Sequence, residues 1–365
     1  MSSDRRKKRY TIPFFIPHKG CPCKCIFCDQ DKISGQEETK VPDIPAVVEK
    51  YLSTIRERDA WIEVGFFGGT FTALPVDLQE HLLVSVKGFL DSGRIKGIRV
   101  STRPDNIDEG KTSFLGNMGV IRVELGVQSM SDRVLKACQR GHTAHDSEVA
   151  SKIVKKAGLG LTHQLMLGLP ESGREEEYHS AVYARKAGAD EVRIYPAVVI
   201  KGTEMERLFR EGSYCPLPED EAVMRAAHLI LFFEASGMKV IRCGLHPSED
   251  LLSGAELVAG PFHESFRAKA ESLLYGYALR YTFKEMPDIH ELCFNPSDEP
   301  YLYGYMGQNA AVLKSLVSDK GVTLRKDPSL ARGSMNIVGR NGTRCLDREH
   351  LASAVLPEGL MKGLR

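Results

Sequence analysis

The sequence feature that most constrains the fold is a regular alternation of short apolar segments with amphipathic segments over the first two thirds of the chain. Short apolar runs favour buried strands, and apolar residues at helical spacing favour helices packed on one face. We expect strands at residues 10–16, 61–67, 97–101, 120–127, 159–167, 191–197 and 238–243. We expect helices just before residue 120 and at residues 45–58, 75–92, 132–158, 174–187 and 219–236. Repeated strand–helix units with short turns predict an α/β fold, a partial (β/α)6 barrel of the TIM type.

A flat, doubly wound parallel sheet is the alternative arrangement of the same units. It has little support, because no G-x-G-x-x-G follows the first expected strand. After about residue 246 the alternation weakens into loops, one helix at 262–279, and short strands with turns. We therefore expect a core domain over residues 1–245, with a basic tail at 1–9. A small C-terminal α+β accessory region over residues 246–365 is expected on the substrate side.

Charge and hydropathy exclude some classes of protein. The 49 basic and 48 acidic residues nearly cancel, so no overall field attracts a polyanion. A run of five cations at residues 5–9 can contact RNA phosphates, with a solvated tail as the alternative reading. No segment approaches the roughly 20 apolar residues of a membrane helix, and Pro13 and Pro17 interrupt the region where a signal peptide would be apolar. We therefore expect a cytoplasmic protein with no membrane partner.

Four of the nine cysteines lie between residues 21 and 28, directly after the first expected strand. Clustered thiols in a large chain indicate a metal site rather than a disulfide framework. Cys21, Cys25 and Cys28 form C-x-x-x-C-x-x-C and can ligate three irons of a cubane cluster, which leaves the fourth iron open. Structural zinc, with Cys23 as a fourth ligand, and unligated thiols are the alternatives, but the spacing is cramped for one tetrahedral ion.

With Phe27 before the last cysteine, this loop resembles the signature of the radical S-adenosylmethionine (radical SAM) superfamily. Further motifs resemble the group that contains the catalytic subunit of Elongator, in the family's order across roughly residues 12–215. They are F-G-G-T-F at 67–71, S-T-R-P-D at 101–105, R-V-E-L-G-V-Q-S at 122–129, R-G-H-T at 140–143, M-L-G-L-P at 166–170, I-Y-P at 194–196 and K-G-T-E at 201–204.

The resemblance implies a 4Fe–4S cluster and S-adenosylmethionine as cofactors. Electron transfer from the cluster cleaves S-adenosylmethionine to methionine and a 5′-deoxyadenosyl radical, and the protein supplies position and dryness. A reductant such as flavodoxin or ferredoxin is the implied electron donor. The residues expected to contact the cofactor are Gly68, Gly69, Thr70, Ser101, Arg103, Glu124, Gln128, Gln164, Gly168 and Lys201. No residue is assigned to the reaction on the substrate.

Several of these residues have plainer alternative readings. The glycines at 68 and 69 also suit an ordinary strand-end turn, and Arg103 also suits a surface salt bridge. For Glu124 the alternative to a place near the ribose or substrate is a buried ion pair with Arg122 or Arg103, since a carboxylate inside an apolar strand needs a partner. Cys23 reads as a buried thiol or as an additional redox-sensitive group.

The resemblance stops at the C-terminal region. The Elongator catalytic subunit continues into an acetyltransferase domain, whereas about 120 residues remain here and show no acetyl-CoA loop. Three functions stay open: a radical SAM enzyme acting on RNA, most simply tRNA; a radical SAM enzyme acting on a small molecule or protein; and a non-catalytic iron–sulfur redox sensor. The sequence does not indicate which oligomeric state the protein has.

Overall fold

The structure is a computed structural model that describes the chain except residues 1–7, 17–20, 22, 30–42, 58 and 365. Most of the expected basic tail therefore lies outside the described residues. All seven expected strands form one sheet in which every neighbouring pair is parallel. Its strands, in spatial order, are β1 (Arg9–Ile16), β2 (Trp61–Gly68), β3 (Gly97–Thr102), β4 (Val120–Gln128), β5 (Gly160–Leu167), β6 (Glu191–Pro196) and β8 (Lys239–Cys243).

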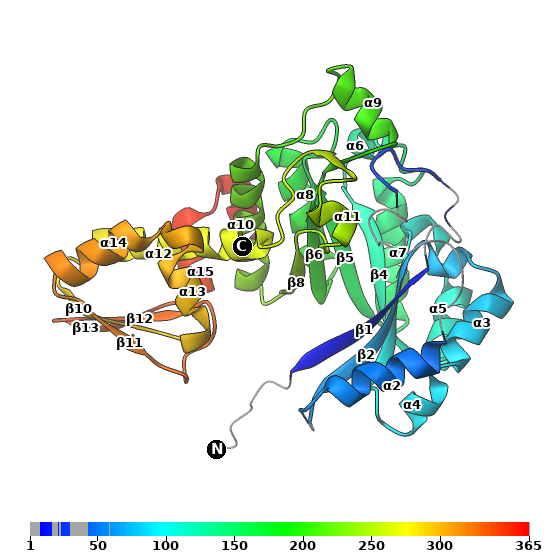
Figure 1. Ribbon diagram of the computed structural model, residues 1–365, viewed down its shortest axis with the longest axis horizontal. Helices are drawn as coiled ribbons and strands as arrows, with labels where there is room; N and C mark the ends of the chain where they lie inside the picture. The colour runs from blue at the N-terminus through cyan, green and yellow to red at the C-terminus, as the bar shows by residue number, and fades with distance from the viewer. Residues whose placement is uncertain (1–7, 17–20, 22, 30–42, 58, 365) are drawn as a thin grey trace.

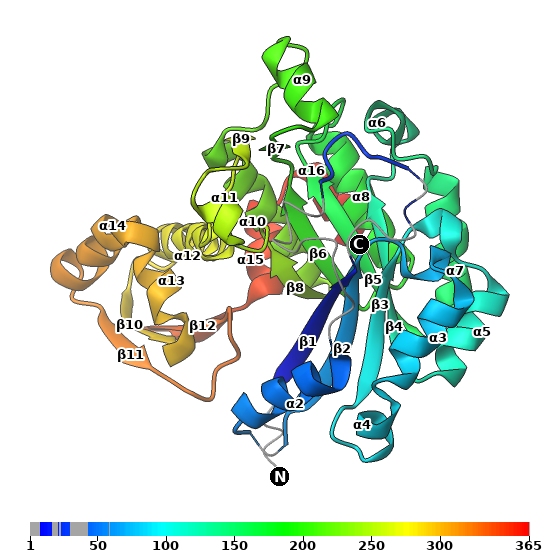
Figure 2. The same cartoon turned by 45° about the vertical axis from the view of Figure 1, so that its right-hand side comes forward.

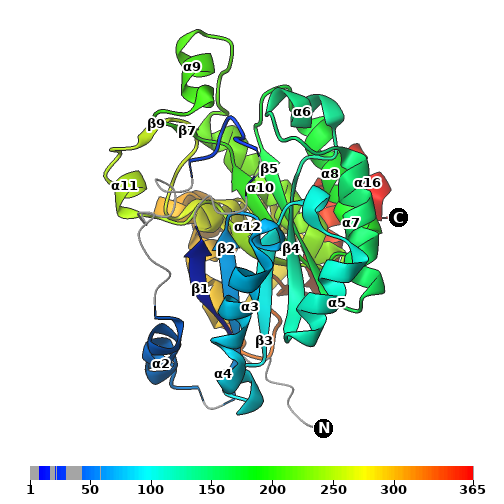
Figure 3. The same ribbon diagram turned by 90° about the vertical axis from the view of Figure 1, so that its right-hand side faces the viewer.

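This sheet curves but does not close (Figure 1), because β1 and β8 each pair with one neighbour only. The predicted partial barrel is confirmed, with β8 as a seventh strand. The strands are rich in buried apolar side chains because helices cover the convex face, as parallel sheets require. Figure 3 shows this layer. Its helices are α2 (Ile44–Thr54), α3 (Val76–Val84), α4 (Lys87–Asp91), α5 (Glu109–Asn117), α7 (Ala144–Lys156), α8 (Arg174–Lys186) and α10 (Glu219–Ala235).

Two helices expected to be continuous are interrupted. The helix expected at 75–92 is divided into α3 and α4, and the helix expected at 132–158 into α6 (Asp132–Ala137) and α7. The second break has a clear cause, because Gln139 and Gly141 adopt the left-handed backbone conformation, with φ of 51° and 74°. That conformation ends a right-handed helix. The segment between α6 and α7 is therefore a loop at the carboxyl end of the sheet.

After β6 the chain builds a second layer of small elements. Two short strands, β7 (Val199–Ile200) and β9 (Leu257–Ala259), pair with each other. The same part of the chain contains the short helices α9 (Glu204–Arg210) and α11 (Glu249–Leu252). Helix α12 (Phe266–Glu285) then leads to a four-stranded sheet in the order β11, β10, β12, β13, which lies to one side of the half-barrel (Figures 1 and 2). The elements of this part are β10 (Ile289–Phe294), α13 (Glu299–Tyr303), α14 (Ala310–Lys314), β11 (Thr323–Lys326), β12 (Met335–Gly339) and β13 (Gly342–Leu346).

The last two helices, α15 (Arg348–Val355) and α16 (Glu358–Leu364), return to the half-barrel and pack on α10 and α8. Arg185 of α8 donates to the carbonyl oxygens of Gly363 and Leu364, at 2.6 and 3.2 Å. One apolar core therefore extends from Ile12 in β1 to Leu360 in α16. Within the described ranges, no helix has both the length and the apolar character that a membrane crossing demands.

Candidate active site

The cysteine loop lies at the carboxyl end of β1, where the ends of parallel strands gather loops into a shared site. The Sγ of Cys21 lies 3.3 Å from the Oγ1 of buried Thr70, which follows β2. Cys25 is buried, and Cys21 and Cys28 line a cavity. Burial raises the pKa of the Cys28 thiol to about 12, and the nearby thiols of Cys25 and Cys21 add to the rise. The thiols of Cys21 and Cys25 therefore lie near that of Cys28.

Two backbone hydrogen bonds hold this loop from opposite sides. The N–H of Ile26 donates to the carbonyl of Cys138 at 3.2 Å, and the carbonyl of Ile26 accepts from the N–H of Met205 at 3.0 Å. Cys23 is turned toward the loop between α6 and α7, because a Cβ built on Gly141 would lie 2.5 Å from its Sγ. In the part of the chain that the structure describes, no three His, Cys, Asp or Glu side chains converge tightly enough for a single metal ion.

The cavity has a volume of about 1590 Å³ and extends from the cysteine loop across the concave face of the sheet to the accessory region. It is lined by most of the residues that the sequence singled out. These are Cys21, Cys28, Gly68, Gly69, Thr70, Ser101, Arg103, Gln128 and Gln164. Asp298, Tyr301 and Arg332 of the accessory region line the other end.

Gly68 at the end of β2 and Gly69 after it bring the backbone close to β1. Gly68 has φ of 100°, and a Cβ there would lie 2.9 Å from the carbonyl oxygen of Ile16. The N–H of Gly69 donates to that same oxygen at 2.9 Å. Glycine is required at position 68 because only a residue without a Cβ tolerates both this dihedral and this approach.

The ends of β3, β4 and β5 place three polar side chains along the cavity wall. The Nε2 of Gln164 donates to the Oγ of Ser101 at 3.1 Å. Gln128 has φ of 64° and an exposed fraction of 8%, and its Oε1 is buried without a hydrogen-bond partner in the described chain. A strained residue with an unpaired amide oxygen in a cavity wall is typical of a ligand-binding position.

Arg103 has an exposed fraction of 2%. The alternative of a salt bridge at the surface is therefore wrong, because the residue is buried. Its Nε and Nη2 donate to the two carboxylate oxygens of Asp105 at 3.0 and 2.8 Å. Its Nη1 is buried without a partner among the described residues. The guanidinium therefore keeps one donor for a group that enters the cavity.

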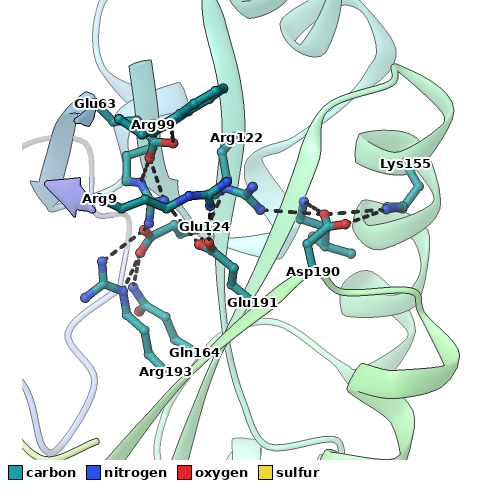
Figure 4. Close-up of polar contacts among 12 residues, drawn as sticks. Arg9, Glu63, Arg99, Arg122, Glu124, Lys155, Gln164, Asp190, Glu191 and Arg193 are labelled. Atoms are coloured by element: carbon teal, nitrogen blue, oxygen red, sulfur yellow. Dashed lines mark hydrogen bonds and ion pairs between the residues drawn. The ribbon is translucent and has the colours of Figure 1, made fainter. Parts of the chain in front are cut away.

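Glu124 is fully buried in β4 and takes part in an ion-pair network inside the half-barrel (Figure 4). Its carboxylate accepts from Arg99 at 2.7 Å and from Arg193 at 2.8 and 3.0 Å. The ion-pair reading of Glu124 holds, but these two arginines replace the expected Arg122 or Arg103. Burial alone would raise the pKa of Glu124, but the charges of Arg193 and Arg99 outweigh burial and lower it.

Arg99 is the centre of this network. Its guanidinium also lies 2.6 Å from Glu63 and 3.1 Å from Glu191, and Figure 4 shows the three carboxylates around it. Arg9 and Arg122 pair with Glu191 from the outside, at 3.3 and 3.5 Å. The network spans strands β1 to β6 and fills part of the interior that a closed barrel would fill with apolar layers.

Arg193 links this network to the cavity. Its guanidinium carbon lies 5.1 Å from the centroid of the Phe67 ring, within the range of a cation–π contact. The Phe67 ring in turn lies 6.0 Å from that of Phe15, and all three side chains line the cavity. The site therefore offers aromatic faces and a fixed cation beside the cysteine loop.

Gly168 and Lys201 do not line the cavity. The N–H of Gly168 donates to Glu177 at 2.8 Å, and its carbonyl accepts from Tyr214 at 2.7 Å. Lys201 is exposed on the turn after β7, where its N–H donates to the carbonyl of Glu256. Their roles toward the cofactor stay predictions, without a supporting contact.

The residues that sequence reasoning left without a role are Arg140, Arg99, Glu63 and Glu191. Arg140 was within a recognised motif, and it donates from Nη1 to the Sγ of Cys25 at 3.2 Å. The other three had a detectable signal, since Glu63 and Arg99 are charged residues inside apolar strands and Glu191 begins one.

Family models and known proteins match most of the chain. The family model described as the radical SAM superfamily matches residues 15–181, and a model described as the Radical_SAM C-terminal domain matches residues 189–275. An uncharacterized protein of Methanocaldococcus jannaschii is 30% identical over 230 residues, which cover 60% of this chain and 70% of that protein.

A tRNA uridine(34) acetyltransferase of Methanocaldococcus infernus is 27% identical over 252 residues, 58% of this chain and 46% of the relative. The chain thus spans about half the length of the tRNA uridine(34) acetyltransferases that it matches. Among solved structures, the archaeal Elp3 of Methanocaldococcus infernus with an N-terminal deletion superposes with a TM-score of 0.56 at 21% identity. The superposition covers 91% of this chain and 74% of the other, and shows a shared fold.

Proposed function

The chain belongs to the radical SAM superfamily, and we propose that this enzyme modifies a nucleoside of tRNA. Its cofactors are a 4Fe–4S cluster and S-adenosylmethionine. The observation that carries the tRNA proposal is the match, across the radical SAM half, to proteins named as tRNA uridine(34) acetyltransferases.

The donor set at the carboxyl end of the sheet fits the cluster. Cys21, Cys25 and Cys28 supply three thiolates, while Cys23 is turned toward Gly141. Buried cationic nitrogens of Arg103 and Arg140 without partners in the described chain also suit an anionic group there.

When bound, the cluster and S-adenosylmethionine supply a 5′-deoxyadenosyl radical that abstracts a hydrogen atom. The chain's own residues bind, orient and exclude water. We assign the backbone at Gly68 and Gly69, the hydroxyl of Ser101 and the free donor of Arg103 to contacts with S-adenosylmethionine. Gln128 and Gln164 complete that wall of the cavity. Glu124 orients Arg193 through two hydrogen bonds rather than contacting a ligand itself.

The cavity beside these residues suits a nucleobase. Phe15 and Phe67 offer ring faces, and stacking on an aromatic side chain is the general means of holding an unstacked base. Arg193 is fixed by Glu124 and can donate to a base carbonyl. The accessory region contributes Tyr301 and Arg332 to the same cavity, which supports its proposed place on the substrate side.

The test uses anaerobically reconstituted protein with dithionite or with reduced flavodoxin or ferredoxin, the proposed electron donors of the cytoplasm. We expect bulk tRNA to co-elute in a salt-dependent way and to increase 5′-deoxyadenosine formation. If tRNA neither binds nor stimulates cleavage, the tRNA proposal is wrong and a small molecule or protein is the substrate. Failure to form any 5′-deoxyadenosine would instead favour a redox sensor.

A variant pair tests the cavity assignment. Phe67→Ala removes a stacking face and should weaken the stimulation by tRNA about tenfold, since one stacked base is worth about 1–3 kcal/mol. Phe89→Ala serves as the control, because Phe89 lies in α4 on the other side of the sheet and is absent from the cavity wall. Equal stimulation in both variants would remove Phe67 from the substrate site.

A further inference from the structure

Arg140 is a buried arginine that contacts the cysteine loop directly. It lies in the loop between α6 and α7 with an exposed fraction of 8%. Its Nη1 donates to the Sγ of Cys25 at 3.2 Å, and its Nη2 donates to the carbonyl oxygen of Gly126 at 2.8 Å. The guanidinium is thus held between a proposed cluster ligand and the end of β4.

The charge of Arg140 has no acidic partner in the described part of the chain. Its hydrogen bonds go to a sulfur and a carbonyl, and its Nε is buried without any partner there. The other buried arginines near the site differ, since Asp105 holds Arg103 and three carboxylates surround Arg99. A buried cation without a counter-charge is costly, so its environment calls for a negative group beside Cys25.

We propose that Arg140 is a positioning residue that sets the reduction potential of the cluster. A cluster held by three thiolates is anionic, and reduction adds one more negative charge. A fixed cation and an N–H···S hydrogen bond favour the more negative form, so they raise the potential. Arg140 therefore makes the cluster easier to reduce by the cellular electron donor, with no change in the bonds that form or break.

Close approaches to the cysteine loop flank this arginine in the chain. Before it, the carbonyl of Cys138 accepts from the N–H of Ile26 in the cysteine loop. After it, Gly141 approaches Cys23 so closely that a Cβ would lie 2.5 Å from the sulfur. The cysteine loop and the loop between α6 and α7 therefore pack together on both sides of Arg140 in the chain.

The experiment is an EPR-monitored redox titration of the reconstituted protein without S-adenosylmethionine. In Arg140→Met, we expect the ratio of reduced to oxidised cluster at a fixed potential to fall about tenfold, which corresponds to a midpoint lower by about 59 mV for one electron. Arg133→Met is the matched control. Arg133 lies in the neighbouring α6 and pairs with Glu171 and Glu176 at the surface, so its loss should leave the potential unchanged.

An unchanged midpoint in Arg140→Met overturns the proposal. If that variant fails to take up iron, the wild-type protein still decides the matter. Reduced protein labelled with guanidinium-¹⁵N arginine should show ¹⁵N hyperfine coupling to the cluster in pulsed EPR, retained in Arg133→Met and lost in Arg140→Lys. Absence of coupling in the wild type would refute the contact.

This inference rests on the proposed cluster ligands, and the two can fail separately. Cys25→Ala should abolish the cluster absorbance, whereas Arg140→Met should keep it and move only its potential. A cluster that survives in Cys25→Ala refutes the ligand set. A normal ligand set with an unmoved potential refutes the role of Arg140 alone.

Discussion

Replacing Arg99 by methionine should strongly destabilise the fold, because Arg99 is the centre of the buried ion-pair network. The residue has an exposed fraction of 4%, and its guanidinium contacts Glu63, Glu124 and Glu191 at 2.6–3.1 Å. Methionine keeps the apolar volume of the side chain but removes the positive charge. Glu124 keeps Arg193, and Glu191 keeps its outer arginines, but Glu63 loses its paired cation.

The expected cost follows from leaving a buried carboxylate without its ion pair, which is about 3–5 kcal/mol of unfolding free energy. Arg94→Met is the matched control. Arg94 makes an equally good two-point contact with Glu49, at 2.6 and 2.7 Å, but both side chains are about half exposed. Exposed pairs contribute about 1 kcal/mol or less. The assay is urea unfolding of both variants and the wild type at pH 7.

The pH dependence gives a second readout. The pKa of Glu124 is lowered in the folded protein, so its pairing stabilises the fold above the unfolded value of about 4.3 and is lost as pH falls through the lower folded value. Arg99 contributes to this lowering of the Glu124 pKa, so the cost of Arg99→Met should shrink as pH falls through the folded value. The reasoning is refuted if Arg99→Met costs no more than Arg94→Met at pH 7.

Two further predictions concern the loops around the site, and a third concerns Glu177 of α8. Cys23→Ser should retain the cluster absorbance, because Cys23 faces Gly141; loss of the cluster would make Cys23 a ligand. Gly141→Ala should lower the iron content, because the new Cβ would clash with the Cys23 sulfur and because position 141 has φ of 74°. Adding Cys23→Ala to that variant should restore part of the iron content. Burial, partly offset by Arg225, raises the pKa of Glu177 to about 7, so the wild type should lose stability relative to Glu177→Gln as pH rises from 4.5 to 7, by roughly 1.4 kcal/mol per unit. Parallel pH dependence of the two unfolding curves would contradict that value.

The half-barrel could be predicted because the local sequence of each strand is enough to identify it. Each is a short apolar run between turn residues, and the order of strands in the sheet is the order in the chain. The helix break at 138–143 was missed because Gln139 and Gly141 sit in an otherwise helical pattern. Their loop contacts the cysteine loop, more than 100 residues earlier in the chain, through the hydrogen bond from Arg140 to Cys25.

The site was predictable where its functional residues lie close together in the sequence. The cysteine spacing and the glycines after β2 carry such information, and the structure brings both to the cavity. The partners of Glu124 were not predictable, because Arg99 and Arg193 come from strands on either side that only the assembled sheet places together. Nor does the sequence reveal that Arg103 has Asp105, while Arg140 has no carboxylate in the described chain.

The return of α15 and α16 to the half-barrel has a consequence for synthesis on the ribosome. Arg185 meets Gly363 and Leu364, which are made 178 and 179 residues later. At about 5–20 residues per second, that interval is roughly 10 to 35 seconds. During this time the surface of α8 and α10 that these helices cover, including Val182 and Phe232 beneath Gly363, is uncovered in the nascent chain. The half-barrel can begin to form early, but one of its apolar flanks has to be shielded by a chaperone or tolerated until the final helix emerges.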